Sequence, residues 1–308
     1  MAYVWQIAVV PFSNKLLVSG VILNGDYKKP KKQKKTNFSH VIGSYFKKPF
    51  RNRQIIISLG EKRHQIRTGE HGDFLLETEQ IPFRDIEIID PVANNPLPII
   101  QDYPKIFHDN NYPVSVISDI DDTLMVSHTA SNWNRIRTLL FIAPPKRKFV
   151  SFTRSVLHTI ASEKGRIFYV SKSESNLFGL LTRVIRQLNL PEGVLFLTPY
   201  LRYKKLLRPK KGKDFKERSI RMIIENSPNK RFILIGDDTQ QDMQVYTRIA
   251  ELYPGRILKI YIHKTRKYLK KDKKDHMDKL MRSGVSFLYF TDQDAVEQEL
   301  EFAKEIKL

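Results

Sequence analysis

The chain has 308 residues, of which 41% are hydrophobic and none is cysteine. This length allows one large domain or two smaller ones, and the apolar content suffices for packed cores, which excludes global disorder. The lack of cysteine excludes disulfides, thiolate nucleophiles and cysteine-bound zinc, while a formal net charge of +20 favours a polyanionic partner.

Residues 1–105 are predicted to form a small β-sandwich domain. Short runs rich in Ile, Val, Leu and Phe alternate there with turn residues, a pattern typical of antiparallel strands. The segment Met1–Phe12 lacks the basic leader and cleavage site of a signal peptide, so we expect it to be the first strand. The other expected strands are 16–23, 54–59, 74–76 and 86–89, and the amphipathic segment 38–46 is expected to be a short helix.

A proline-rich segment, residues 91–113, separates this half from the rest. Its five prolines argue against regular structure, and we place the domain boundary near residue 105. Residues 106–308 then alternate short apolar runs with helix-like segments, which predicts an α/β domain with right-handed crossovers and a largely parallel sheet. The expected strands are 114–118, 166–170, 193–197, 231–235, 256–262 and 285–289, and the expected helices are 151–162, 175–189, 216–226, 240–252, 264–282 and 293–306.

Polar side chains follow three of these strands directly. The strand 114–118 continues into Asp119-Ile120-Asp121-Asp122-Thr123, and the strand 166–170 continues into Ser171-Lys172-Ser173. The strand 231–235 continues into Gly236-Asp237-Asp238, with Asp242 shortly after. Because ligands bind at the carboxyl ends of strands in open parallel sheets, we expect these carboxylates, a hydroxyl and a lysine to converge at one edge.

Crowded carboxylates raise one another's pKa unless a cation lies among them, so the two acidic loops indicate a divalent metal ion. Ligands that are all oxygen atoms favour Mg²⁺ over zinc, and Mg²⁺ would allow a carboxylate to attack an anionic phosphate. Asp119 would then be the nucleophile and form a phosphoaspartate, while Asp121 would protonate the leaving oxygen and later activate water. For Asp238 and Asp242, a capping or turn role is the open alternative.

The order of these motifs resembles that of the haloacid dehalogenase superfamily. Within it, residues 117–128 (ISDIDDTLMVSH) look like the catalytic domain of the phosphatidate phosphatases first known from a yeast actin-patch protein. The tract from Lys216 to residues 232–242 (FILIGDDTQQD) is similar to the second long motif of that family. In the N-terminal half, residues 18–22 and 68–74 look like pieces of the β-sandwich that precedes this domain in bacterial relatives.

The resemblance implies a haloacid dehalogenase-like Rossmannoid sheet with little or no cap, and it implies a role for each matching residue. The implied catalytic residues are Asp119, Asp121 and Lys216, although a lysine at a helix start could also be merely solvated. Phosphate would be bound by Thr123, Ser171 and Lys172. The candidate Mg²⁺ ligands are Asp119, Asp121 through its backbone carbonyl, Asp237, Asp238 and Asp242. Lys172 and Asp238 stand where the family usually has serine, at positions near the leaving group of the substrate.

The leading prediction is therefore a Mg²⁺-dependent phosphatase that hydrolyses phosphatidate to diacylglycerol and phosphate. Three Lys/Arg clusters, in residues 28–35, 202–213 and 264–274, would hold a cytoplasmic protein on an anionic membrane surface, by about 1 kcal/mol for each well-placed side chain. One alternative is a phosphatase for nucleic-acid ends, which the charge suits equally, although few aromatic residues interleave the clusters. The other is a catalytically silent lipid-binding module, against which the crowded carboxylates argue.

Overall fold

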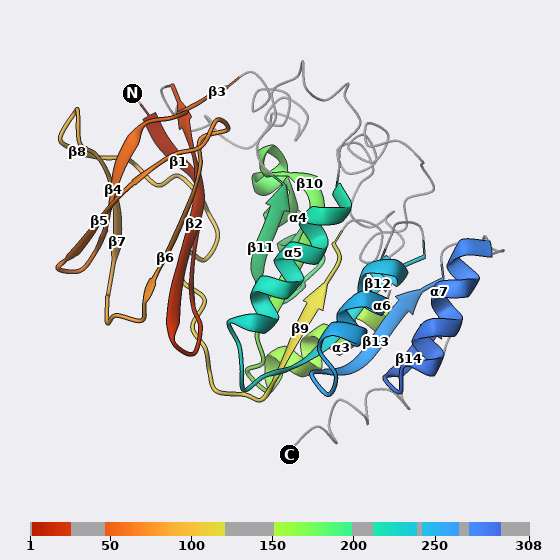
Figure 1. Ribbon diagram of the computed structural model, residues 1–308. Helices are drawn as coiled ribbons and strands as arrows, with labels where there is room; N and C mark the ends of the chain where they lie inside the picture. The colour runs from red at the N-terminus through yellow and green to blue at the C-terminus, as the bar shows by residue number, and fades with distance from the viewer. Residues whose placement is uncertain are drawn as a thin grey trace. The chain divides into compact units, whose positions relative to one another are not determined.

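The computed structural model describes residues 2–25, 47–120, 151–198, 212–238, 242–264 and 271–290 (Figure 1). The predicted helices 38–46 and 293–306 lie outside these ranges. The chain divides into two compact units: Met1–His108 with Ser173–Val184 and Leu197–Lys210, and Asp109–Lys172 with Ile185–Phe196 and Lys211–Leu308. The domain boundary near residue 105 stays a prediction.

The N-terminal part of the chain forms two four-stranded antiparallel sheets. One consists of β1 (Ala2–Pro11), β2 (Lys15–Asn24), β3 (Lys48–Pro49) and β6 (Asp73–Glu79), and the other, in spatial order, of β5 (Lys62–Arg67), β4 (Gln54–Leu59), β7 (Ile86–Asp90) and β8 (Asn95–Pro96). Buried side chains of both sheets, among them Val4, Ile57 and Ile88, belong to one hydrophobic core cluster. The two sheets therefore pack face to face as a sandwich.

The sequence did not predict strands β3, β5 and β8 of this sandwich, and β5 is the longest of the three. Five of its six residues are polar or charged, so it shows no hydrophobic alternation. It forms because it pairs with β4, with Ile66 opposite Ile55, and it lies at the edge of its sheet. Charged side chains are common on edge strands because they discourage pairing with other chains.

The second unit is built on a six-stranded sheet, in which every pairing given by register is parallel. Its spatial order is β11 (Val194–Thr198), β10 (Ile167–Glu174), β9 (Val114–Ser118), β12 (Arg231–Asp237), β13 (Ile257–His263) and β14 (Ser286–Phe290). The central strand β9 is buried along its whole length, and its sequence VSVIS combines three apolar residues with two serines. The prediction of an α/β fold with a largely parallel sheet is confirmed.

Helices alternate with the strands of this sheet along the chain. They are α3 (Ser151–Ser162), α4 (Phe178–Gln187, preceded by the 3-10 turn Ser175–Leu177), α5 (Gly212–Glu225), α6 (Asp242–Leu252) and α7 (Lys271–Arg282). Figure 1 shows α5, α6 and α7 side by side on one face. On α3, Phe152 packs against Tyr261 and Phe290, with ring centroids 5.2 and 4.4 Å away. Among the described residues, no helix combines the length and the apolar character that a membrane span requires.

The strand order reverses direction at the β9–β12 pair. From β9 the chain moves outward through β10 and β11, and it then returns to the other side of β9 with β12. Neighbouring strands whose connections leave in opposite directions form a topological switch point, and ligands of open α/β sheets bind at such points. In the β9–β12 pair, Ser118 lies opposite Ile235, so the residues that follow both strands emerge together.

Candidate active site

Asp119 is held at the carboxyl end of β9 by backbone hydrogen bonds. The N–H of Asp119 donates to the carbonyl oxygen of Ile235 at 2.8 Å. The hydroxyl of Ser118 donates to the carbonyl oxygen of Asp119 at 2.8 Å. The residue is fully buried. These contacts fix the Asp119 carboxylate at the switch point between β9 and β12.

Three buried carboxylates converge there. Asp119, Asp237 and Asp242 each offer an oxygen atom, and these atoms all lie within 4.8 Å of one another. Asp237 ends β12, and its N–H donates to Asp242 Oδ2 at 3.3 Å. Gly236 permits this approach, since a Cβ atom there would lie only 2.6 Å from Asp242 Oδ2. We refer to Asp119, Asp237 and Asp242 as the acidic cluster.

Tyr246 ties the start of α6 to the sheet, and α6 is the helix that carries Asp242. The hydroxyl of Tyr246 donates to the carbonyl oxygen of Ile235 at 2.9 Å. Burial raises the pKa of Tyr246 well above its usual value, and the charge of Asp242 raises it further, so the hydroxyl stays protonated. Asp242 is therefore fixed from both the helix and the strand.

Lys216, on α5, reaches this cluster from the facing helix. Its side chain is 1% exposed, and its Nζ donates to Asp119 Oδ1 at 2.9 Å and to Asp242 Oδ1 at 2.6 Å. Burial by itself lowers the pKa of Lys216, but Asp119 and Asp242 outweigh it and hold the pKa well above its usual value. Lys216 is thus a charged, buried partner of two carboxylates, and the solvated alternative does not apply.

The charge of the acidic cluster fits a divalent cation. Three carboxylates and one ammonium sum to a formal charge of −2 (three times −1, plus 1). Asp119 Oδ2 is buried and has no hydrogen-bond partner among the residues that the structure describes. Burial raises the pKa of Asp242, and Asp119 adds to this effect while Lys216 opposes it. Buried oxygen donors with excess negative charge are the ligands that hard divalent cations prefer.

Strand β10 brings Ser171 and Lys172 to the same edge. The strand continues to Glu174, so both residues lie on the strand, whereas the sequence placed them in a loop after it. Ser171 is fully buried. Burial lowers the pKa of Lys172 and the nearby charge of Lys216 lowers it further, whereas all three carboxylates of the acidic cluster raise it. Lys172 therefore lies within the electrostatic field of the cluster.

The remaining predicted site residues are placed differently. Asp238 is buried, but it is not one of the three carboxylates that converge. Its Oδ2 accepts a hydrogen bond of 2.7 Å from the hydroxyl of Tyr289 on β14. Asp121 and Thr123 lie outside the described residues. Sequence reasoning missed Tyr289, because nothing local to residues 285–289 links them to Asp238.

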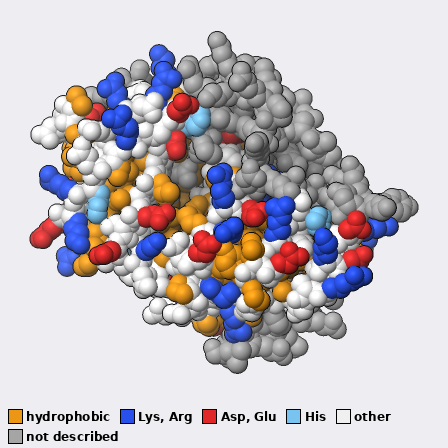
Figure 2. Space-filling model, in the orientation of Figure 1, with side chains coloured by type: hydrophobic (Ala, Val, Ile, Leu, Met, Phe, Trp, Pro, Cys, Tyr) orange, Lys and Arg blue, Asp and Glu red, His pale blue; other side chains and the backbone are white. Residues whose placement is uncertain are grey.

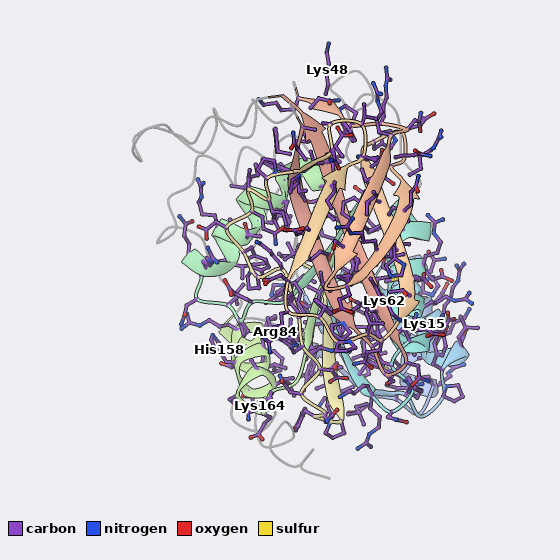
Figure 3. All side chains as sticks on the ribbon, turned by 90° about the vertical axis from the view of Figure 1, so that its left-hand side faces the viewer. Lys15, Lys48, Lys62, Arg84, His158 and Lys164 are labelled. Atoms are coloured by element: carbon purple, nitrogen blue, oxygen red, sulfur yellow. The ribbon has the colours of Figure 1, made fainter. Side chains whose placement is uncertain are left out.

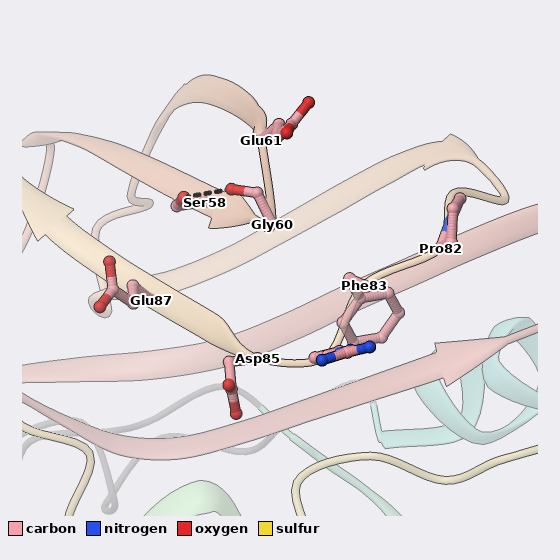
Figure 4. Close-up of a pocket in the computed structure, with 8 residues that line it drawn as sticks. Ser58, Gly60, Glu61, Pro82, Phe83, Asp85 and Glu87 are labelled. Carbon is pink, nitrogen blue, oxygen red and sulfur yellow. Dashed lines mark hydrogen bonds between the residues drawn. The ribbon is translucent and has the colours of Figure 1, made fainter.

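The sandwich carries a pocket of its own (Figure 4). Its lining includes one hydrogen bond, from Ser58 Oγ to the carbonyl oxygen of Gly60 at 3.3 Å. It contains none of the residues expected to act on phosphate. Its walls are Ser58, Gly60, Glu61, Pro82, Phe83, Arg84, Asp85 and Glu87.

Two curated proteins resemble part of this chain. Phosphatidate phosphatase APP1 of Saccharomyces cerevisiae is 29% identical over 201 residues, which cover 63% of this chain and 34% of the yeast protein. An uncharacterized protein of Schizosaccharomyces pombe is 25% identical over 154 residues, which cover 48% of this chain and 25% of that protein. The chain thus spans about a third or less of the length of these curated relatives.

Among solved structures, one chain of a Pnkp1/Rnl/Hen1 complex is similar at 16% sequence identity. The match covers 50% of this chain and 50% of that chain. The TM-score is 0.35, which does not establish a shared fold. The family evidence is more direct, because residues 114–264 match the family described as phosphatidate phosphatase APP1, catalytic domain. This range includes β9, β12, Lys216 and the whole acidic cluster. Residues 114–264 of this chain therefore resemble the APP1 phosphatidate phosphatase catalytic-domain family.

Proposed function

We propose that the protein is a Mg²⁺-dependent phosphatase that hydrolyses phosphatidate to diacylglycerol and phosphate, on a haloacid dehalogenase-like sheet. The observation that carries the proposal is the buried arrangement of Asp119, Lys216 and the other two carboxylates inside the APP1-family region. A purely structural site would gain little from three buried carboxylates with one lysine, because buried charge without full compensation is costly.

Asp119 is the proposed nucleophile. Lys216 holds its Oδ1, while Oδ2 has no partner among the described residues, so the carboxylate is oriented without being fully engaged. An oxygen of Asp119 would attack phosphorus, and the bond from phosphorus to the diacylglycerol oxygen would break, leaving an aspartyl phosphate. Asp121 would protonate the departing oxygen, then take a proton from the water that attacks phosphorus, which releases phosphate and restores Asp119.

The remaining groups would bind the phosphoryl oxygens and the metal ion. The hydroxyl of Ser171 and the ammonium of Lys172 lie at the same sheet edge, where they could donate to phosphate oxygens together with Thr123. Asp119, Asp237 and Asp242, with the backbone carbonyl of Asp121, would hold Mg²⁺. When bound, Mg²⁺ would offset the negative charge that otherwise keeps a carboxylate and a phosphate apart.

An anionic lipid surface is the proposed partner, with the protein in the cytoplasm and peripheral on membranes. Exposed cations are numerous on the described surface (Figure 2), and Figure 3 shows Lys48 projecting outward at the end of the sandwich that carries β3. Exposed Arg51, Arg53 and Arg67 lie near β3, because Thr68 donates its hydroxyl to the carbonyl oxygen of Phe50 at 2.6 Å and its N–H to that of Arg53 at 2.9 Å. Such side chains would contribute about 1 kcal/mol each near an anionic membrane.

The proposal can be tested on the purified protein with three substrates: phosphatidate in mixed micelles, an aryl phosphate and a 5′-phosphorylated oligonucleotide. Each is assayed with Mg²⁺ and with a chelator, for the wild type, Asp119→Asn and the matched control Asp278→Asn, which changes an exposed aspartate on α7. We expect Mg²⁺-dependent phosphate release from phosphatidate that Asp119→Asn abolishes and Asp278→Asn preserves.

Other outcomes would redirect the assignment. Preference for the oligonucleotide would reject the lipid substrate in favour of nucleic-acid ends, which the net charge of +20 also suits. Lack of Mg²⁺-dependent release from any substrate, or release unaffected by Asp119→Asn, would reject the enzyme. Vesicle binding that persists in such an inactive protein would point to the silent lipid-binding module.

A further inference from the structure

Asp238 is a buried carboxylate directly beside the acidic cluster that does not join it. It follows Asp237 in sequence and is 0% exposed, yet within the described part of the chain the carboxylates that bring oxygen atoms together are those of Asp119, Asp237 and Asp242. Its side chain instead accepts the 2.7 Å hydrogen bond from Tyr289, and its N–H donates to the carbonyl oxygen of His263 at 3.2 Å. The end of β12 is thus held by a residue of the adjacent strand β13 and by a residue of the edge strand β14.

Tyr289 is firmly anchored for this role. It lies on β14, which pairs with β13 so that Tyr289 is opposite Ile262 and Phe290 is opposite His263. Phe290 is fully buried against Phe152, and its carbonyl oxygen accepts the N–H of Lys264 at 2.7 Å. Strand β14 also lies beyond the region matched by the APP1 family, which ends at residue 264. The hydroxyl that holds Asp238 therefore comes from a part of this chain outside the family match.

The Tyr289 hydroxyl stabilises the buried carboxylate of Asp238 at this position. A buried carboxylate is costly unless it is hydrogen-bonded, and the Tyr289 hydroxyl supplies such a bond. Burial raises the pKa of Tyr289, and the bond to Asp238 raises it further, so the hydroxyl remains a donor. Loss of this donor would change the contacts of Asp238 Oδ2 and so move the adjoining peptide that aims Asp237.

We propose that Tyr289 is a positioning residue for the metal site: by holding Asp238 outside the acidic cluster, it fixes the direction of the Asp237 carboxylate. This inference rests on the proposed function in one respect, namely that the cluster binds a divalent cation. Partners that orient ligands commonly change metal affinity by about 10- to 100-fold when they are removed. Tyr289→Phe removes only the hydroxyl, so it isolates this contact.

The test measures Mn²⁺ affinity directly, from the electron paramagnetic resonance signal of free Mn²⁺, in the full chain without substrate. Tyr289→Phe should weaken Mn²⁺ binding by about tenfold or more. The matched control is Tyr253→Phe, which also removes a hydroxyl bonded to a carboxylate, that of Glu225, but away from the cluster. Tyr253→Phe should bind Mn²⁺ like the wild type. In activity assays, Tyr289→Phe should raise the Mg²⁺ concentration for half-maximal rate while the KM for phosphatidate stays unchanged.

Two substitutions of Asp238 separate positioning from direct ligation and do not require Tyr289→Phe to fold. Asp238→Asn keeps an oxygen that can accept from Tyr289, so it should retain Mn²⁺ affinity, whereas Asp238→Ala should lose it as Tyr289→Phe does. If Asp238 were itself a ligand, Asp238→Asn would lose affinity as well. In a protein that already carries Asp238→Ala, adding Tyr289→Phe should not weaken Mn²⁺ binding further.

The outcomes distinguish the two proposals. A wild-type protein that binds no Mn²⁺ would reject the metal site and with it the proposed function. A wild-type protein that binds Mn²⁺, together with Tyr289→Phe or Asp238→Ala affinities within about twofold of it, would overturn the positioning role alone. Loss of affinity in Asp238→Asn would also overturn it, in favour of direct ligation.

Discussion

Lys216→Met tests most directly whether the acidic cluster is held by a buried ion pair. Methionine is also long and unbranched and fills a similar space, but it carries no charge, so the change removes the contacts to Asp119 at 2.9 Å and to Asp242 at 2.6 Å. Both carboxylates are fully buried and would lose their ammonium partner. We expect a clear loss of stability of the unit that contains the cluster.

The magnitude follows from the burial of all three groups. Removing one partner of a buried pair costs about 3–5 kcal/mol, because an uncompensated charge stays in the interior. Domains of ordinary size have a free energy of unfolding of about 5–15 kcal/mol, so a loss of this size is large. Mg²⁺ should restore part of it, because a cation that binds the native carboxylates stabilises the folded state by mass action.

The assay is urea unfolding followed by circular dichroism, with a chelator and with Mg²⁺. Lys279→Met, at an exposed position on α7, is the matched control and should change the free energy of unfolding by less than about 0.5 kcal/mol. In the double variant Lys216→Met with Asp242→Asn, part of the loss should return, because one of the two stranded charges is gone. A loss below about 1 kcal/mol for Lys216→Met in the chelator would refute the reasoning.

Three further predictions concern pH, metal and packing. The folded-state pKa of Lys216 is raised, so its contribution is fully present below the unfolded lysine pKa of about 10.4 and is lost as pH rises through the folded value. Unfolding at a series of pH values should therefore show a constant gap between wild type and Lys216→Met from about pH 7 to 9.5, and a gap that closes earlier would contradict this. Mg²⁺ at about 100 times its Kd should stabilise the wild type by about 2.7 kcal/mol in calorimetry, and Asp237→Asn should lose most of this gain; equal gains would count against Asp237 as a ligand. Phe152→Ala should cost about 3–5 kcal/mol in urea unfolding, since its ring is buried against Tyr261 and Phe290, and a cost near zero would show that α3 does not pack as described.

Much of the parallel sheet could be predicted because its strands are covered on both faces. The segment that became β12 contains the continuous apolar run 232–235, and the segment that became β9 is apolar at three of its five positions. Both predicted strands begin at the residues where the structure begins them. Strand β5 could not be predicted in this way, since its residues KRHQIR carry little hydrophobic signal and its conformation depends on pairing with β4. The predicted end of β10 was too early, because Ser171 and Lys172 look like loop residues although the strand continues through them.

For the candidate site, the sequence indicates which side chains stand at strand ends, and the tertiary structure selects among them. Asp237 and Asp238 are neighbours with the same side chain, and no local pattern distinguishes them. The structure brings Asp237 into the acidic cluster and turns Asp238 toward Tyr289, a residue 51 positions away. That choice depends on β14 adding to the edge of the sheet beside β13.

The sequence by itself thus determined the alternation of strands and helices, the acidic ends of the strands that became β9 and β12, and an excess of negative charge that calls for a cation. These properties are local, because they follow from the apolar period and from the residues next in the chain. Only the tertiary structure decided that Lys216 is buried between Asp119, 97 positions away, and Asp242, 26 positions away. The physical reason is that such contacts depend on how α5 and α6 pack against the sheet, which no local pattern in the sequence specifies.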